Sequence, residues 1–374
     1  MLLQRFFDQS TLAHPDKEAL VCGATRVSYA DLARRAMHIA HALSGCGVKR
    51  GDRVALFLDN SIEMVASVLA VLRVGGVFMP INPLTKTDKL AYMLNDSGAA
   101  VLVTQPAFQH VWRGALEQSP VLGHCLVAQA PDAAWQPADP RCIRLLPPAP
   151  QALVASLAEP EYNIDQDLAA IIYTSGSTGS PKGVMLTHLN MVSATRSIAT
   201  YLELRSDDRI VCALPLSFDY GLYQVLMTFF VGATLVLETS FTFPVKVLQS
   251  MEREKVTVFP GVPTVFSMLM ALKTLPEFDL RHLRTITNTA AALSEEHISQ
   301  LRALFPQARL FSMYGLTECK RVTYLPPEQL DIRPTSVGRG MPNEEVWLVD
   351  DAGNRLPNGS TGELVIRGSN VMRG

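Results

Sequence analysis

The sequence predicts an α/β fold in which two αβ-layered subdomains with mostly parallel sheets precede a part built of short hairpins. Apolar strand-like runs alternate with helical patterns through the first hundred residues, and the alternation resumes after residue 165. This rhythm is typical of parallel sheets covered by helices on both faces. The chain has 374 residues, 48% of them hydrophobic, so we expect two or three packed units rather than one core.

The elements of the first unit follow from apolar spacing and from end signals. Residues 29–47 carry apolar side chains at helical spacing and end in Gly, which commonly stops a helix. A helix over 61–76 begins at Ser61, a capping residue, with Glu63 in its first turn. A third helix is predicted over 86–98, and strands over 52–59, 77–83 and 99–105. Pro, Ala and Gln dominate residues 129–160, which predicts a loose surface connection.

The second unit contains strands that run into loops. Residues 168–179 and 206–221 each predict a strand followed by a loop, and 229–238 and 256–264 predict strands. Residues 283–305 predict a strand, a loop and a helix, and 309–318 a strand followed by a turn. Residues 345–368 alternate in short strands around Asp-Ala-Gly-Asn and Pro-Asn-Gly-Ser, so antiparallel hairpins are expected there.

Charge and hydropathy exclude several classes of protein. The 33 Lys and Arg against 35 Asp and Glu give a formal net charge of −2, which argues against a nucleic-acid partner. The longest apolar regions, 64–80 and 221–237, are interrupted by polar residues and turns, so no membrane span is expected. The N-terminus is broken by Gln4 and Arg5 and lacks the cleavage site of a secretion signal.

The cysteines indicate a reducing, cytoplasmic location. None of them forms a C-x-x-C pair, so zinc binding is not expected, and isolated cysteines in a long chain are typical of the cytosol. The six are Cys22, Cys46, Cys125, Cys142, Cys212 and Cys319.

The segment YTSGSTGSPKGV, residues 173–184, combines Gly, Ser and Thr with a single Lys. Gly lets backbone N–H groups converge on a ligand, hydroxyls add donors, and Lys adds a charge, which together suit a polyphosphate. A flexible linker is the alternative, but apolar segments on both sides argue against it. The spacing matches neither the Walker A pattern nor G-x-G-x-x-G.

The longer segment YTSGSTGSPKGVMLTH resembles the signature phosphate loop of the adenylate-forming, AMP-binding superfamily. This group includes acyl-CoA synthetases, the adenylation domains of peptide synthetases, and firefly-type luciferases. LPLSFDYG, YGLTE and GELVIRG resemble the second loop, third loop and late hairpin of the family, in the expected order. The resemblance runs from about Phe6 to Gly374, and residues 304–346 are most similar to bacterial stand-alone acyl-CoA or acyl-carrier ligases.

The resemblance implies an architecture. The chain would be the large N-terminal domain, with αβ subdomains at about 1–160 and 161–335 and a small distorted β-barrel subdomain at 336–374. The family continues with a ribose-binding Asp, a hinge and a small domain that carries a reactive-site Lys. None of these follows NVMRG, so we expect this chain alone to bind nucleotide and acyl-adenylate but to be impaired in turnover.

The resemblance also implies a two-step reaction and a set of ligands. A small carboxylic acid would attack the α-phosphate of ATP, with Mg²⁺ present, to give an acyl-adenylate and pyrophosphate. The thiol of CoA, or of phosphopantetheine on an acyl or peptidyl carrier protein, would then displace AMP. A non-catalytic adenylate-binding protein and a luciferase-like oxygenase remain alternatives of other classes.

Phosphate, metal and adenine contacts are carried over residue by residue. Thr174, Lys182 and Glu318 are the expected catalytic residues, with Glu318 and Thr174 at Mg²⁺. Lys182 could instead be a solvated lysine, and Glu318 could lie in the first turn of a helix capped by Thr317. The expected nucleotide contacts are Thr174, Ser175, Gly176, Ser177, Thr178, Gly179, Lys182, Asn288, Ala290, Ala291, Tyr314, Gly315 and Thr317.

The acid-binding pocket is expected between the second loop, the strand end near Val262 and the SMYG segment. In amino-acid-activating relatives an Asp at the position of Asp219 pairs with the substrate ammonium, so Asp219 suggests an amine-bearing substrate; it could equally accept N–H bonds from its own turn. His188 and Cys319 are expected to be structural. The expected pocket residues are Phe218, Asp219, Tyr220, Tyr223, Val262, Met313 and Gly315.

Overall fold

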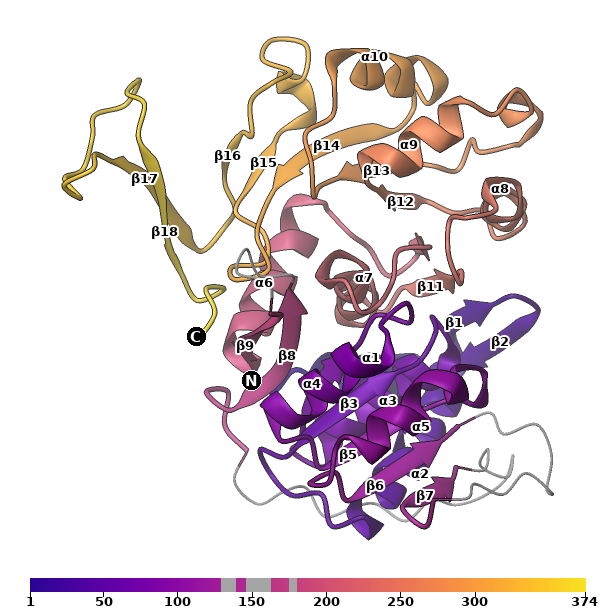
Figure 1. The fold of residues 1–374 in the computed structure, drawn as a ribbon. Helices are drawn as coiled ribbons and strands as arrows, with labels where there is room; N and C mark the ends of the chain where they lie inside the picture. The colour runs from indigo at the N-terminus through magenta and orange to yellow at the C-terminus, as the bar shows by residue number, and fades with distance from the viewer. Residues whose placement is uncertain (129–138, 146–162, 175–179) are drawn as a thin grey trace.

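The computed structural model describes residues 1–128, 139–145, 163–174 and 180–374, and its described strands form two large sheets and one hairpin. Figure 1 shows the seven-stranded sheet in the N-terminal half, the nine-stranded sheet beside it, and the hairpin projecting from the far side. The predicted α/β class with mostly parallel sheets is therefore confirmed.

The seven-stranded sheet has the order β7-β6-β5-β3-β4-β8-β9 and is parallel except for the last pair. Its side chains are buried on both faces: Val54 and Leu56 enter one core cluster, whereas Ala55 and Phe57 enter another. Successive residues of a strand point to opposite faces, so helices must cover both. The strands are β3 (Arg53–Phe57), β4 (Val77–Pro80), β5 (Val101–Thr104), β6 (His124–Val127), β7 (Cys142–Arg144), β8 (Leu168–Thr174) and β9 (Lys182–Thr187).

Two pairs of helices cover this sheet, and their ends match the sequence signals. α2 (Tyr29–Gly45) and α3 (Ile62–Arg73) pack into the first cluster, and α4 (Thr87–Ser97) and α5 (Gln109–Glu117), preceded by η1 (Pro106–Phe108), into the second. The Ser61 hydroxyl accepts a hydrogen bond from the Met64 N–H, which confirms the predicted cap. Gly98 ends α4 with φ of +58°.

The nine-stranded sheet has the order β16-β15-β14-β13-β12-β10-β11-β1-β2. It is parallel from β14 to β1, and β2, β15 and β16 are added antiparallel. The strands are β1 (Glu18–Cys22), β2 (Thr25–Ser28), β10 (Arg209–Cys212), β11 (Thr234–Leu237), β12 (Val258–Gly261), β13 (Thr285–Asn288), β14 (Arg309–Tyr314), β15 (Thr323–Leu325) and β16 (Arg339–Gly340).

The first core cluster joins both sheets into one body. It contains side chains of both sheets and of the helices between them, from Leu56 to Leu235. The helices of this second half and of the N-terminus are α1 (Arg5–Ala13), α6 (His188–Tyr201), α7 (Asp219–Val231), α8 (Pro244–Arg253), α9 (Pro263–Met270) and α10 (Glu295–Leu304), with short turns η2 (Leu275–Glu277) and η3 (Pro327–Gln329).

The chain exchanges strands between the sheets. β1 and β2 come from the N-terminal region but belong to the nine-stranded sheet, and β8 and β9 follow residue 160 but belong to the seven-stranded sheet. The sheets therefore do not coincide with the predicted ranges 1–160 and 161–335, and that division stays a prediction about domains.

Three local predictions need correction. The third part is an antiparallel hairpin of β17 (Glu344–Val349) and β18 (Glu363–Gly368), and no closed barrel is formed by the described residues. The predicted strand over 229–238 begins only at Thr234, because Phe229–Val231 still belong to α7. The predicted connection over 129–160 contains strand β7 and otherwise lies largely outside the described residues.

Within the described residues, no helix combines the length and the apolar character that crossing a bilayer requires.

Candidate functional site

A cavity of about 330 Å³ lies where loops of the two sheets meet, and three sequence-distant motifs contribute to its wall. Thr174 comes from the first loop, Phe218 from the second and Thr317 from the third. These loops leave the carboxyl ends of β8, β10 and β14, which is where α/β sheets commonly bind ligands. The lining residues are Pro80, Ile81, Asn82, Thr85, Lys89, Met93, Ile172, Tyr173, Thr174, Ser217, Phe218 and Thr317.

The first loop connects β8 and β9, which are antiparallel neighbours in the seven-stranded sheet. Thr174 ends β8 and lies opposite Lys182, the first residue of β9, so the hydroxyl and the exposed ammonium flank one loop. The Tyr92 hydroxyl donates to the Pro181 carbonyl at 3.2 Å, which ties the end of the loop to α4. The predicted phosphate contacts Ser175, Gly176, Ser177, Thr178 and Gly179 lie outside the described residues.

The second loop is held by Asn60, which lies in the segment that follows β3 of the seven-stranded sheet. Asn60, 7% exposed, donates from Nδ2 to the Leu214 carbonyl at 2.9 Å and to the Glu238 carbonyl at 3.0 Å. Its Oδ1 accepts from the Leu216 N–H at 2.9 Å. Phe218 at the loop end is 37% exposed. Asn60 therefore fixes the loop that carries Phe218 against the seven-stranded sheet.

The third loop is a turn rather than a helix. Residues 317–319 form a turn after β14, so the alternative of Glu318 in the first turn of a helix capped by Thr317 is wrong. A Cβ on Gly315 would collide with the Lys320 carbonyl oxygen, so the tight chain path requires glycine there. Tyr314 is the half-buried last residue of β14.

Glu318 fits the role of a magnesium ligand in its chemistry. Its side chain is partly exposed and follows Thr317 of the cavity wall. Within the described ranges no cluster of three His, Cys, Asp or Glu could hold a metal by itself. Magnesium commonly takes one or two protein carboxylates and completes its shell with phosphates and water, so a single Glu suits a nucleotide-bound ion.

The predicted adenine segment follows β13. Asn288 is fully buried, and its Nδ2 donates to the Ala291 carbonyl at 2.9 Å, while its Oδ1 finds no partner among the described residues. Ala290 has φ of +74°, a left-handed conformation that favours glycine, and both alanines are exposed. Ala290 is therefore accommodated with backbone strain.

The predicted acid-pocket walls differ in exposure. Tyr220 and Met313 are buried, and the Tyr220 hydroxyl contacts the Thr287 hydroxyl at 2.6 Å. Burial raises the pKa of the Tyr220 hydroxyl to about 12. The buried Tyr223 hydroxyl has no hydrogen-bond partner in the part of the chain that the structure describes, and Val262, the residue before α9, is half-buried. None of these four lines the 330 Å³ cavity.

Asp219 is paired with a lysine of the chain itself. Asp219, 6% exposed, is the first residue of α7, and its Oδ2 lies 3.1 Å from the Nζ of Lys320. Burial lowers the pKa of Lys320 to about 7, and Asp219 opposes this shift. Neither the local turn nor a substrate amine is needed to explain Asp219, so its value as a sign of an amine substrate is reduced.

Sequence reasoning missed Lys320 and its neighbour Arg321, which are 4% and 1% exposed. A signal existed, since two adjacent cations stand in CKRVTYL, an otherwise mostly apolar segment. It also missed Lys89, an exposed cation of α4 on the cavity wall.

His188 and Cys319 were expected to be structural, and both side chains are buried. His188 is 1% exposed, and its Nδ1 accepts from the Leu3 N–H at 3.0 Å. Cys319 is 4% exposed, and burial raises the pKa of its thiol to about 11, which keeps it protonated at neutral pH.

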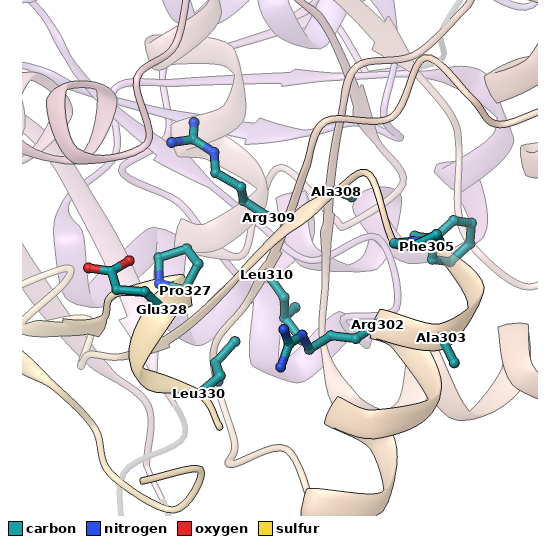
Figure 2. A pocket seen from close by; sticks show the side chains of 10 residues that line it. Arg302, Ala303, Phe305, Ala308, Arg309, Leu310, Pro327, Glu328 and Leu330 are labelled. Carbon is teal, nitrogen blue, oxygen red and sulfur yellow. The ribbon is translucent and has the colours of Figure 1, made fainter. Parts of the chain in front are cut away.

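A second cavity of about 520 Å³ lies between α10, β14 and η3 and contains none of the predicted site residues. Figure 2 shows Arg302, Leu310 and Glu328 on its wall. No residue that lines this cavity also lines the 330 Å³ cavity.

Comparison with known proteins identifies the family. The family described as AMP-binding enzyme matches residues 7–374. The chain is 34% identical to 4-coumarate--CoA ligase 5 of Oryza sativa subsp. japonica, over 96% of this chain and 66% of that protein. It is 30% identical to one of the plipastatin synthase proteins of Bacillus subtilis, over 98% of this chain and 14% of that protein.

A solved structure agrees with these relatives. ATP-bound MatB from Rhodopseudomonas palustris aligns with all of this chain and 72% of its own, at 29% identity and a TM-score of 0.84. The chain spans less than two thirds of the length of either sequence relative. The chain belongs to the family of AMP-binding, adenylate-forming enzymes.

Proposed function

We propose that this protein activates a small carboxylic acid with ATP. The observation that carries the proposal is the single cavity to which Thr174, Phe218 and Thr317 all contribute. Three motifs so far apart in the sequence would have no common reason to line one space unless one ligand contacts them all. Membership of the adenylate-forming family and similarity to an ATP-bound enzyme support ATP as that ligand.

The reaction is a displacement at phosphorus. A carboxylate oxygen of the acid attacks the α-phosphorus of ATP, the bond to the bridging oxygen of the β-phosphate breaks, and pyrophosphate leaves with that electron pair. The protein contributes mainly alignment and neutralisation of phosphate charge. Thr174 and Lys182, opposite each other at the base of the first loop, are the groups proposed for the phosphates. Mg²⁺ bound with Glu318 would supply further positive charge on the phosphates.

Transfer to a thiol is the second part of the proposal. The acyl group would pass from the adenylate to the sulfur of CoA or of a carrier-protein phosphopantetheine, and AMP would leave. One relative is named as a CoA ligase and another as part of plipastatin synthase, which supports both acceptors. An amino acid handed to a peptidyl carrier protein remains a proposed variant of the same reaction.

The proposal is tested by acid-dependent exchange of labelled pyrophosphate into ATP by the full-length protein. Glu318→Gln is expected to lower the exchange rate by about 100-fold, because one oriented charge contact at the phosphates is lost. Glu328→Gln, in the 520 Å³ cavity, is the matched control and should stay within about twofold of the wild type. Equal exchange by Glu318→Gln and the wild type would contradict the proposed role.

A further inference from the structure

Two adjacent cations, Lys320 and Arg321, are buried with a single anionic partner among the described residues. Phe218 and Thr317 line the cavity, and Asp219 and Lys320 follow them by one and three positions in the chain. Lys320 pairs with Asp219 at 3.1 Å, and its Nζ lies 4.5 Å from the centre of the Tyr223 ring. Lys320 is therefore electrically compensated.

Arg321 has no anionic partner among the described residues. Its side chain is 1% exposed, and its Nη1 donates to the Met313 sulfur at 3.0 Å. Its Nε and Nη2 are buried and find no hydrogen-bond partner within the described ranges. The guanidinium carbon stands 4.8 Å from the centre of the Tyr220 ring. An unpaired buried charge is costly, so a group absent from the chain itself is expected to complete this site.

The two free nitrogens have the geometry that binds a carboxylate. Nε and Nη2 form one edge of the guanidinium, and two parallel hydrogen bonds from such an edge are the usual grip of Arg on a carboxylate. The same chain gives an example: Arg50 binds Asp167 through Nε at 2.9 Å and Nη2 at 2.7 Å.

No described carboxylate of the chain fills this position. Asp219 is paired with Lys320. Glu344 of β17 accepts from the Asn370 Nδ2 at 3.0 Å and the Met341 N–H at 3.4 Å. Among the described residues neither acid forms an ion pair with Arg321, whose free edge is left for an external anion.

We propose that the acid activated by this protein carries a second carboxylate, which binds the Nε and Nη2 edge of Arg321 beside the Lys320–Asp219 pair. The inference rests on the proposed function, because it names the substrate class of that same site. The reacting carboxylate would face the α-phosphate of ATP, and the second one would be buried against α7 and β14. Tyr220 and Met313, predicted from the sequence as pocket walls, contact the guanidinium that would hold it.

The test compares acids that differ only in the second carboxylate. Full-length protein is assayed by pyrophosphate exchange with succinate against butanoate and with aspartate against 3-aminobutanoate. We expect the diacid to exceed its partner at least about 100-fold in kcat/KM in one pair, because a site built for a polar group rejects the analogue that lacks it. In Arg321→Met we expect the ratio of kcat/KM between diacid and monoacid to fall below about 10-fold, because kcat/KM for the diacid decreases.

Thermal unfolding separates a binding role from a structural role. Without ligand, Arg321→Met should unfold at the wild-type temperature or above it, because an unpaired buried charge is removed. Arg284→Met is the matched control: Arg284 is paired with the buried Asp208, so this variant should unfold at a lower temperature.

The outcomes are distinguishable. Exchange with the monoacids as fast as with the diacids would overturn the inference and leave the proposed function standing. A loss of thermal stability in Arg321→Met as large as that in Arg284→Met would also overturn it, because Arg321 would then be structural. Absence of exchange with every acid, monoacids included, would overturn the proposed function itself.

Discussion

Ala290 holds a backbone conformation that its side chain disfavours. Its φ is +74°, and a Cβ in the left-handed region costs roughly 1–2 kcal/mol. Ala290→Gly is expected to raise the free energy of unfolding by about 0.5–1 kcal/mol, which is the strain relieved less the extra chain entropy of glycine. Denaturant unfolding measures the change.

Ala291 provides the matched control for that substitution. Ala291 does not have a positive φ, so Ala291→Gly adds only chain entropy to the unfolded state and should lower stability by up to about 1 kcal/mol. An equal effect of the two substitutions would contradict the strain argument.

His188 makes stability depend on pH in a defined window. Burial lowers the pKa of its imidazole from 6.5 to about 4. Between these values the unfolded chain binds more protons than the folded one, so stability is full above pH 6.5 and decreases as the pH falls towards 4. The decrease from pH 6.5 to pH 5 should be about 1.5 kcal/mol.

A neutral substitution isolates that contribution. His188→Asn keeps an acceptor for the Leu3 N–H but cannot titrate, so this part of the slope should vanish in denaturant unfolding at several pH values. His282→Asn, at an exposed position, should leave this pH dependence of the free energy of unfolding unchanged. A slope unchanged in His188→Asn would refute the assignment.

For single residues, the sequence indicated candidate site positions more readily than the residues that they contact in the fold. Asp219 was singled out as a candidate site residue, but its partner Lys320 lies about a hundred residues away, after β14. The pairing of Asp219 with Lys320 depends on how α7 packs beside β14, which no local pattern encodes. Arg321 was missed although the two adjacent cations in the mostly apolar segment CKRVTYL are a local signal.

At the scale of secondary-structure elements, the second loop depends on Asn60, a side chain from the segment after β3. Asn60→Ala removes the hydrogen bonds of this side chain to the backbone groups of Leu214, Leu216 and Glu238. We expect a loss of about 3 kcal/mol in the free energy of unfolding and a raised KM for the acid, because Phe218 follows this loop. Thermal unfolding and pyrophosphate exchange measure the two effects.

An exposed asparagine supplies the reference for Asn60. Asn95 donates one surface hydrogen bond to the Gln118 carbonyl, so Asn95→Ala should cost below about 1 kcal/mol and leave KM unchanged. If the Asn60 variant behaved like the Asn95 variant, the second loop would not need this anchor.

Elements were predictable where a local signal was strong. α3 follows from its Ser61 cap and apolar spacing, and β3 and β5 from short apolar runs. The apolar stretch at the end of α7 was taken for a strand because helix and buried strand share this composition, and only Gly232 and Thr234 mark the change. The turn at Thr317 resembled a cap because Thr followed by Glu suits both structures.

For the whole molecule, the α/β class was predictable and the sheet membership was not. Alternating strands and helices determine the class, but β1 pairs with β11 across more than two hundred residues, and β8 pairs with β4 of the N-terminal region as well as with β9, which follows it. Such pairings are set by the burial of complete faces against a shared core. They bring Thr174, at the end of β8, to the same cavity as Phe218 and Thr317, which follow strands of the nine-stranded sheet.

The central claim is that this cavity holds an adenylate. The most direct measurement is a crystal structure of the full-length protein with a non-hydrolysable acyl-adenylate mimic. The account predicts density for the mimic between Thr174, Phe218 and Thr317, with Glu318 beside its phosphate or phosphate substitute. Density elsewhere, for example in the 520 Å³ cavity beside Arg302 and Glu328, with the 330 Å³ cavity empty, would contradict it.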